Sequence, residues 1–315
     1  MPDFQGDVLT NDVLATLPPC DIEFSRRECA TPFSDRRSEC GVAMPVVSAE
    51  QRYVLLYTSG STGMPKGVAL EHHSIVNFCH WYVKEFQMTP TDHALGYANF
   101  GFDAHMMDIY PALTIGASVY IISSEMRMDL MGMNQYMETN AINIAFMTTQ
   151  VGYMFATVIE NKSLRLLSVG GEKLMPLRKP RFDFYNAYGP TECTIFSTLY
   201  KITSDYDSSL IGRPLDNYRL FVVDESLRLV PKGVAGELII AGAGVGRGYL
   251  HPAEKDAHKF TTLFGQPCYR TGDLVRWSED NNIEFLGRID GQVKLRGLRI
   301  EMGEIEARAT KYEGV

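Results

Sequence analysis

The chain has 315 residues, of which 45% are hydrophobic and 22% charged, and its formal net charge is −8 at pH 7. These values are typical of a globular protein with enough residues for one large domain or two ordinary ones. The acidic balance argues against non-specific nucleic-acid binding, and six cysteines without Cys-x-x-Cys spacing argue against a metal cluster or a disulfide framework. No signal peptide and no apolar run long enough to cross a bilayer is visible, so we expect a cytoplasmic protein without a membrane partner.

The first half of the chain alternates between strand-like and helix-like patterns. Residues 1–50 are irregular and are expected to be a partly loop-like lead-in. Apolar runs then predict strands at 53–57, 67–70, 117–122, 142–147 and 164–169. Apolar residues at helical spacing predict helices around 75–86 and 133–137. This alternation predicts an α/β fold with a mainly parallel sheet covered by helices.

The pattern changes after Thr191. Short strands are predicted at 198–202, 219–223, 236–240 and 283–286, separated by turn residues, with a single helix-like piece at 252–260. We therefore expect an antiparallel or barrel-like, β-rich subdomain at about 198–289.

A glycine-rich and hydroxyl-rich segment lies between the first two predicted strands. From position 57 it reads Tyr-Thr-Ser-Gly-Ser-Thr-Gly-Met-Pro-Lys-Gly-Val. Glycines let backbone N–H groups approach an anion, hydroxyls donate to phosphate oxygens, and the lysine adds positive charge. We predict a polyphosphate cradle, with an ordinary solvated turn as the alternative, although the spacing differs from a Walker A loop. Its candidate ligands are Thr58, Ser59, Gly60, Ser61, Thr62, Gly63 and Lys66.

Two further clusters carry polar residues in turns. The segment 186–192, Asn-Ala-Tyr-Gly-Pro-Thr-Glu, places Tyr188 and Glu192 at the C-terminal edge of a strand, where open α/β sheets bind ligands. The segment 269–274, Tyr-Arg-Thr-Gly-Asp-Leu, contains Asp273, whose carboxylate can accept both hydroxyls of a ribose. An ordinary Gly-Pro turn and a β-turn aspartate are the respective alternatives. The glycine run 242–248 misses the Gly-x-Gly-x-x-Gly spacing by one position, and we assign it no catalytic role.

These motifs, in this order, resemble the adenylate-forming (AMP-binding) enzyme superfamily, and the segment 57–63 resembles most its amino-acid-activating branch, the adenylation domains of nonribosomal peptide synthetases. The resemblance covers about Tyr53–Ile305. It implies nucleotide contacts for Gly170, Gly171 and Glu172 along the adenine, Asn186 near its amino group, Tyr188 stacked on it, and Asp273 and Arg288 at the ribose. It also implies catalytic roles for Lys66, Thr191 and Glu192, with Mg²⁺ at Glu192 and ATP oxygens completing its shell.

The same resemblance implies a pocket for the amino acid. Asp103, in Phe102-Asp103-Ala104-His105, matches the carboxylate that pairs with a substrate α-ammonium group, although an aspartate before a helix is also a common N-cap. The other matched positions are all apolar: Ala104, Met107, Phe146, Leu167, Val169, Ala187, Ile195 and Phe196. An apolar pocket rejects polar side chains, so we expect a hydrophobic amino acid similar to Leu, Ile, Val or Met. Core packing is the alternative for Phe146, Leu167 and Val169.

The implied reaction converts an amino acid and ATP into an aminoacyl-adenylate and pyrophosphate. The implied partners are carrier-protein and condensation domains of a larger synthetase, with phosphopantetheine on a separate carrier domain. We expect a large core subdomain at 1–289 with a short N-terminal part, a hinge at Asp290, and the start of a small C-terminal subdomain at 290–315. The chain is thus expected to be a fragment that lacks the C-terminal lysine of the family and is poorly active alone.

Two other functions remain open at this point. An acyl- or aryl-CoA ligase, or a D-alanine–carrier-protein ligase, belongs to the same superfamily, although Asp103 argues against the CoA ligases. A non-catalytic nucleotide-binding module inside an assembly is the binding-class alternative.

Overall fold

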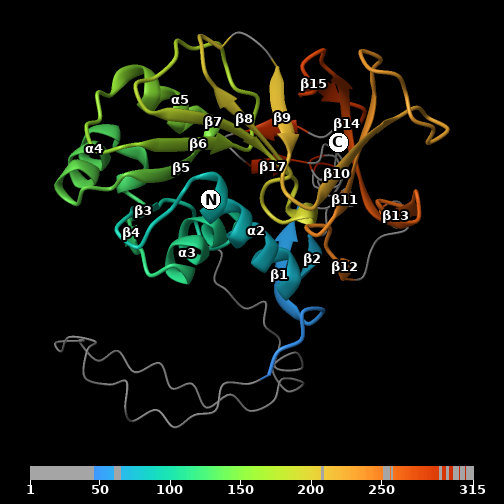
Figure 1. Cartoon of the computed structure of the whole chain (residues 1–315), viewed down its shortest axis with the longest axis horizontal. Coiled ribbons are helices and arrows are strands. Elements are labelled where there is room, and N and C mark those ends of the chain that lie inside the picture. The colour runs from blue at the N-terminus through green and yellow to red at the C-terminus, as the bar shows by residue number, and fades with distance from the viewer. Residues whose placement is uncertain are drawn as a thin grey trace. The chain divides into compact units, whose positions relative to one another are not determined.

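The computed structural model describes residues 46–59, 65–206, 209–250, 256 and 258–290, the backbone of 293–295 and 298–300, and residues 305 and 309 (Figure 1). Contacts divide the chain into the units Met1–Val46 and Val47–Val315. The second unit contains all the elements described below. The lead-in expected over residues 1–50 lies almost entirely outside the described residues.

A sheet of twelve strands contains a parallel half, as the sequence predicts. Its strands pair in the order β7-β6-β5-β3-β4, and every pair among them is parallel. Their bounds are β3 (His93–Gly96), β4 (Ser118–Ile121), β5 (Ile144–Thr148), β6 (Leu166–Gly170) and β7 (Asp183–Tyr188). All five residues of β6 are buried, which is typical of a strand covered on both faces.

Helices cover both faces of this parallel half (Figure 1). They are α2 (His72–Glu85), α3 (Ala104–Thr114), α4 (Leu130–Thr139) and α5 (Thr149–Val158), with the 3₁₀ turns η2 (Met126–Met128) and η3 (Thr191–Cys193). Apolar side chains of α2 and α3 pack in one core cluster with Phe146 and Ala187. Those of α4 and α5 pack in a second cluster with Leu167 and Val169. The helices predicted from apolar spacing are confirmed.

The second half of the sheet is antiparallel and continues from β7 without a break. Its strands are β8 (Thr198–Ile202), β9 (Leu210–Pro214), β10 (Tyr218–Val223), β11 (Gly236–Gly242), β13 (Phe260–Leu263), β14 (Gln266–Trp277) and β15 (Ile283–Arg288). The described strands run in one open order from β10 to β4 and do not close. The β-rich part is therefore the antiparallel half of a shared sheet, and its described strands form an open sheet and no closed barrel. The predicted helix-like piece at 252–260 is wrong at its end, because Phe260 starts β13; residues 251–255 and 257 lie outside the described residues.

A small separate sheet carries the ends of the glycine-rich segment. It joins β1 (Arg52–Thr58), β2 (Lys66–Glu71) and β12 (Gly248–Leu250) in antiparallel order. A last hairpin comprises β16 (Val293–Leu295) and β17 (Leu298–Ile300). No helix in the described ranges is long and apolar enough to span a membrane. The pairing of β12 with β2 brings residues near 250 beside residues near 67, which matters for the site below.

Candidate active site

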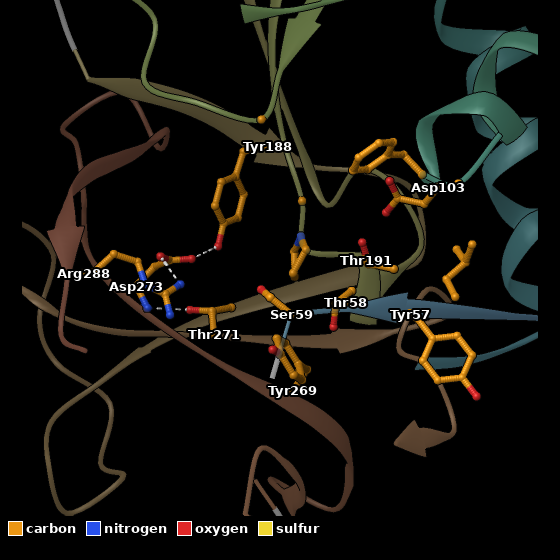
Figure 2. Close-up of a pocket in the computed structure, with 16 residues that line it drawn as sticks. Tyr57, Thr58, Ser59, Asp103, Tyr188, Thr191, Tyr269, Thr271, Asp273 and Arg288 are labelled. Carbon is orange, nitrogen blue, oxygen red and sulfur yellow. Dashed lines mark hydrogen bonds and ion pairs between the residues drawn. The ribbon is translucent and has the colours of Figure 1, made fainter. Parts of the chain in front are cut away.

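A cleft of about 290 Å³ opens where segments from both halves of the sheet meet (Figure 2). Its polar lining comes from the end of β1, the loop before α3, the end of β7, the turn η3, and strands β14 and β15. These polar residues are Tyr57, Thr58, Ser59, Asp103, Tyr188, Thr191, Tyr269, Thr271, Asp273 and Arg288. Figure 2 shows Tyr188, Asp273 and Arg288 together at one end and Asp103, Thr191 and Thr58 toward the other. The cleft thus unites motifs that lie far apart in the sequence.

The beginning of the predicted phosphate cradle lines this cleft. The hydroxyl oxygens of Thr58 and Ser59 are buried and have no hydrogen-bond partner among the described residues. Buried hydroxyls without partners are uncommon, because the lost hydration is not replaced. A ligand with acceptor oxygens would satisfy both. Gly60, Ser61, Thr62 and Gly63 lie outside the described residues, so the rest of the cradle stays a prediction.

Lys66 lies in a buried ion pair next to the cleft. Its Nζ is 3.2 Å from Oδ1 of Asp256, and the two side chains are 5% and 3% exposed. The same Nζ lies 5.0 Å from the centroid of the Tyr249 ring, within the range of a cation–π contact. Lys66 is not among the residues that line the cleft. Sequence reasoning missed Asp256, because nothing in the local pattern connects it with a lysine 190 positions earlier.

The 3₁₀ turn η3 carries Thr191 and Glu192. Thr191 lines the cleft, whereas Glu192 is fully buried. The hydroxyl of Tyr249 donates a hydrogen bond of 2.6 Å to Oε1 of Glu192. The same hydroxyl lies 3.3 Å from that of Tyr269, whose side chain lines the cleft. The Glu192 carboxylate is therefore connected to the cleft wall through two tyrosines.

The chain after η3 has an unusual backbone. Thr194 and Ile195 both have positive φ, at 60° and 69°, which is strained for β-branched residues. Two contacts from the glycine run hold this turn: the Thr194 hydroxyl donates to the carbonyl of Gly244 at 2.8 Å, and the Gly246 amide donates to that of Glu192 at 2.8 Å. The glycine run thus supports η3 through hydrogen bonds.

The opposite end of the cleft contains a network around Asp273. The Tyr188 hydroxyl donates to Oδ2 of Asp273, and Nη1 of Arg288 donates to Oδ1 at 2.7 Å. Arg288 also contacts Asp290 through Nε and Nη2 at 2.8 and 2.6 Å. Burial, together with the neighbouring Asp273, raises the pKa of the Tyr188 phenol well above its usual value. The phenol is therefore a hydrogen-bond donor across the neutral pH range.

A second cavity of about 340 Å³ adjoins this network. It is lined by six residues predicted at the nucleoside: Gly171, Glu172, Asn186, Tyr188, Asp273 and Arg288. The amide of Asn186 donates to the Leu210 carbonyl at 3.0 Å and to the Tyr206 hydroxyl at 3.4 Å, so both of its donor hydrogens have partners. Gly170 packs against the β7 backbone, since a Cβ there would lie 2.8 Å from the Ala187 carbonyl oxygen.

The side chain of Glu237 stabilises the backbone next to Asp273 by hydrogen bonds, and sequence reasoning did not predict this function. Its Oε1 accepts the Gly272 amide at 3.1 Å, and its Oε2 accepts Nη2 of Arg270 at 2.6 Å. The Thr271 hydroxyl adds a bond of 2.8 Å to the Leu238 carbonyl. These bonds fix strand β14 against β11 at the position where Asp273 enters the cleft.

A third cavity, of about 220 Å³, matches most of the predicted amino-acid pocket. Of the nine residues predicted for that pocket, six line it, namely Asp103, Ala104, Phe146, Ala187, Ile195 and Phe196, and Gly170, which was predicted at the adenine, lines it as well. Asp103 occupies the N-cap position of α3 but makes no capping hydrogen bond through its side chain, so the N-cap alternative explains its position and not its carboxylate. The lining also includes polar residues that the sequence did not predict, namely Tyr97, Asn99, Arg127 and Thr148.

Three predicted pocket residues do not line this cavity. Phe146 pairs with Ser168 across β5 and β6, so Ser168 and Gly170 share the face of Phe146, while Leu167 and Val169 point to the other face. Leu167 and Val169 are fully buried in the core under α4 and α5. Met107 is also core, 1% exposed. The prediction was displaced by one residue in β6: Ser168 and Gly170 stand on the face of Phe146, and of these two Gly170 lines the cavity.

The amino-acid sequence of this chain is similar to those of known proteins. Residues 14–250 match the family model of the AMP-binding enzymes. Surfactin synthase subunit 2 of Bacillus subtilis (strain 168) is 41% identical over 98% of this chain, and tyrocidine synthase 1 of Brevibacillus parabrevis is 38% identical over 89%. The chain spans 8% and 27% of the lengths of these two relatives.

Solved structures of adenylation domains have a similar fold. PA1221, described as an NRPS protein containing adenylation and PCP domains, superposes with a TM-score of 0.78 at 28% identity, over 89% of this chain and 52% of that one. The Vibrio cholerae adenylation domain AlmE, solved with glycyl-adenosine-5′-phosphate, gives 0.76 at 27% identity, over 85% and 54%. The chain belongs to the AMP-binding enzyme family, and within it to the adenylation domains of nonribosomal peptide synthetases.

Proposed function

We propose that this chain activates an amino acid with ATP, forming an aminoacyl-adenylate and pyrophosphate. The observation that carries the proposal is one cleft that unites three features: the hydroxyls of Thr58 and Ser59, which have no partner within the described part of the chain, the carboxylate of Asp103, and the Asp273–Arg288 pair. These groups suit, in turn, a polyphosphate, an α-ammonium group and a ribose.

The chemistry needs little from the protein beyond placement and charge. In this proposal the substrate carboxylate attacks the α-phosphorus in line. The bond between the α-phosphorus and the α,β-bridging oxygen breaks, and pyrophosphate leaves with that oxygen and its electron pair. Thr58, Ser59 and Thr191 donate to phosphate oxygens, and Lys66 adds positive charge when it turns from Asp256. Tyr188 and Asp273 hold the nucleoside, and Asp103 holds the substrate ammonium group.

The residues present fit a magnesium ion in donor chemistry. Glu192 offers a carboxylate, the oxygen ligand this hard cation prefers, one residue from Thr191 on the cleft wall. The described residues include no group of three or more His, Cys, Asp or Glu side chains suited to a metal. In our proposal ATP oxygens supply the other ligands, and the ion, when bound, neutralises charge on the phosphates.

We propose a hydrophobic substrate side chain, similar to that of Leu, Ile, Val or Met. The support is the apolar part of the 220 Å³ cavity, formed by Phe146, Ala187, Ile195 and Phe196. Arg127 favours a second candidate, a side chain with a terminal hydrogen-bond acceptor. Its Nε and Nη1 donate to the Tyr97 carbonyl at 2.6 Å and the Ser124 hydroxyl at 3.0 Å, and its side chain also lines the cavity.

Partners and domain limits are proposals of the same kind. We propose transfer of the activated amino acid to phosphopantetheine on a carrier domain, next to condensation domains in a larger synthetase. The support is that the similar structure PA1221 contains adenylation and PCP domains. We retain the limits 1–289 and 290–315 for the large core and the start of a small C-terminal subdomain.

Amino-acid-dependent ATP–pyrophosphate exchange tests the proposal, measured on this chain with pools of amino acids. Exchange with a hydrophobic pool supports the proposed substrate class, and splitting the pool names the amino acid. Exchange only with an acidic or amide pool supports the Arg127 candidate. Exchange with fatty or aryl acids alone would replace the proposal with an acyl-ligase activity. ATP binding without any exchange would favour the alternative that the protein is a non-catalytic nucleotide-binding module.

Replacing Asp103 tests its contact with the substrate ammonium group. Asp103→Asn should raise KM for the amino acid by about tenfold to a hundredfold, the size expected for losing a hydrogen bond between charged groups, and should leave KM for ATP nearly unchanged. Asp129→Ala is the matched control, because Asp129 caps α4 by accepting the Gly132 amide at 2.9 Å. This control should lower Tm without changing KM. An equal loss of stability in both variants would show that Asp103 is only a cap.

A further inference from the structure

The side chain of Tyr249 contacts both Glu192 and Lys66, the two charged groups at the proposed phosphate end. Its hydroxyl donates to Glu192 at 2.6 Å, and its ring faces the ammonium group of Lys66 at 5.0 Å. Glu192 is 0% exposed and Lys66 only 5%. Buried charges depend on their few partners, so one side chain that contacts both has a large influence on their positions.

The backbone around Tyr249 is fixed to the two elements that carry these charges. On one side, Gly246 donates its amide to the carbonyl of Glu192 at 2.8 Å. On the other side, β12 pairs with β2, which begins at Lys66, with Tyr249 opposite Val68 and Leu250 opposite Gly67. The ring also packs edge-on against Phe260, with centroids 5.0 Å apart. Tyr249 is thus held between η3 and β2 by main-chain bonds as well as by its own contacts.

The hydroxyl of Tyr249 also connects Glu192 with the cleft. Its oxygen is 3.3 Å from that of Tyr269, which lines the 290 Å³ cleft. A carboxylate held in this way has a fixed orientation relative to the cleft wall. The ring and the hydroxyl therefore act on different charges, the ring on Lys66 and the hydroxyl on Glu192.

We propose that Tyr249 is a positioning residue for adenylate formation: its hydroxyl orients the Glu192 carboxylate for the cation that accompanies ATP, and its ring holds Lys66 for the pyrophosphate. This proposal rests on the proposed function, because it assumes that Glu192 and Lys66 serve a magnesium-bound polyphosphate. Tyr249 itself touches neither substrate nor cation. Its effect is expected in the requirement for cation and pyrophosphate rather than in amino-acid selection.

Two substitutions separate the functions of hydroxyl and ring. Tyr249→Phe keeps the ring and should raise the Mg²⁺ concentration for half-maximal exchange about tenfold, the size expected for one lost hydrogen bond to a charged group, with little change in KM for pyrophosphate. Tyr249→Leu removes both contacts and should also raise KM for pyrophosphate about threefold to thirtyfold. Neither variant should change KM for the amino acid.

Tyr218→Phe is the matched control, since the Tyr218 hydroxyl donates to the main-chain carbonyl of Cys193 in the same turn at 2.9 Å and not to the carboxylate. It should leave the Mg²⁺ requirement unchanged. An equal shift in this control would show general loosening of η3 and would overturn the proposal, as would an unchanged or lower Mg²⁺ requirement in Tyr249→Phe.

A second readout separates this proposal from the proposed function. Binding of Mn²⁺ in the presence of ATP, followed by electron paramagnetic resonance, should weaken about tenfold in Tyr249→Phe even in a protein that catalyses no exchange. Absence of exchange in the wild type with normal Mn²⁺·ATP binding would remove the proposed function alone. Equal Mn²⁺ affinity in wild type and Tyr249→Phe would contradict the proposal that Tyr249 positions Glu192 and would leave the proposed function unaffected.

Discussion

At the scale of single residues, the acidic side chains of this protein differ chiefly in what surrounds them. Asp273 is paired with Arg288, and Asp256 with Lys66, so each has a cation within 3.2 Å. Asp108 has no cation at that distance among the described ion pairs and accepts two main-chain amides, from Tyr97 at 2.9 Å and Ala98 at 2.7 Å. Burial raises the pKa of Asp108 to about 8. Its position on α3 therefore has a consequence for stability.

The raised pKa of Asp108 predicts a pH-dependent loss of stability. Between pH 4 and pH 8 the folded state holds a proton on Asp108 that the unfolded state has released, so the free energy of unfolding should fall as pH rises through this window. Asp108→Asn removes the titration and keeps an oxygen that accepts the two amides. Urea unfolding from pH 5 to pH 9 should show a flatter profile in the variant, which becomes the more stable protein above pH 8. A parallel profile would contradict the assignment.

Sequence alone predicted several residues that line the cleft, but it did not predict the residues that support them. Asp103, Tyr188, Asp273 and Arg288 stand in local motifs, and each lines a cavity. Supporting residues such as Tyr249 become recognisable only after distant strands pair. Their identities follow from tertiary contacts, which leave no signature in a local pattern.

At the scale of elements, strand β6 shows where pattern reading fails. All five of its residues are buried, so no alternation of polar and apolar residues marks the side that faces the pocket. The prediction was therefore displaced by one residue: it assigned Leu167 and Val169 to the face of Phe146, where Ser168 and Gly170 lie. Strand β1 has mixed exposure, and its two ends were predicted to within one residue.

The glycine run gives a prediction at this scale. A Cβ at Gly244 would overlap the Tyr218 phenol, and the Gly244 carbonyl accepts the hydroxyl of the strained Thr194. Gly244→Ala should therefore lower the free energy of unfolding by at least about 2 kcal/mol. Gly233→Ala is the control: its φ is +84° with nothing within 4 Å, so it should lose only about 1 kcal/mol from backbone strain. Urea denaturation compares them, and equal losses would argue against close packing at Gly244.

At the scale of the whole described unit, one sheet changes from parallel to antiparallel between β7 and β8. The cleft draws on both halves: β7 supplies Tyr188, while β14 and β15 supply Asp273 and Arg288. Relative movement of the two halves would therefore change the distance between the two sides of the proposed nucleoside site. The sequence predicted the change from strand–helix alternation to short strands. It did not predict that these strands share a single sheet, because β15 pairs with β9, about 70 positions earlier in the chain.

The parallel end of this sheet predicts a tendency to self-associate. Strand β4 is the last strand in the described order, and its Ile121 is 54% exposed. Edge strands with apolar side chains pair readily with other chains, and a lysine there discourages pairing. Ile121→Lys should reduce aggregation in light scattering and lower Tm by no more than about 3 °C. Met128→Lys, at a residue 80% exposed on η2, controls for the added charge and should not reduce aggregation.

The ion pair between Lys66 and Asp256 also bears on the order in which the protein is made. Its two partners are 190 positions apart, and β2 obtains its neighbour β12 only when residues near 250 have left the ribosome. At ordinary rates of synthesis that interval lasts roughly ten to forty seconds. Throughout it the nascent chain carries an uncompensated lysine on an incomplete small sheet. The phosphate end of the site is therefore expected to assemble late, after the parallel half of the large sheet has emerged and folded.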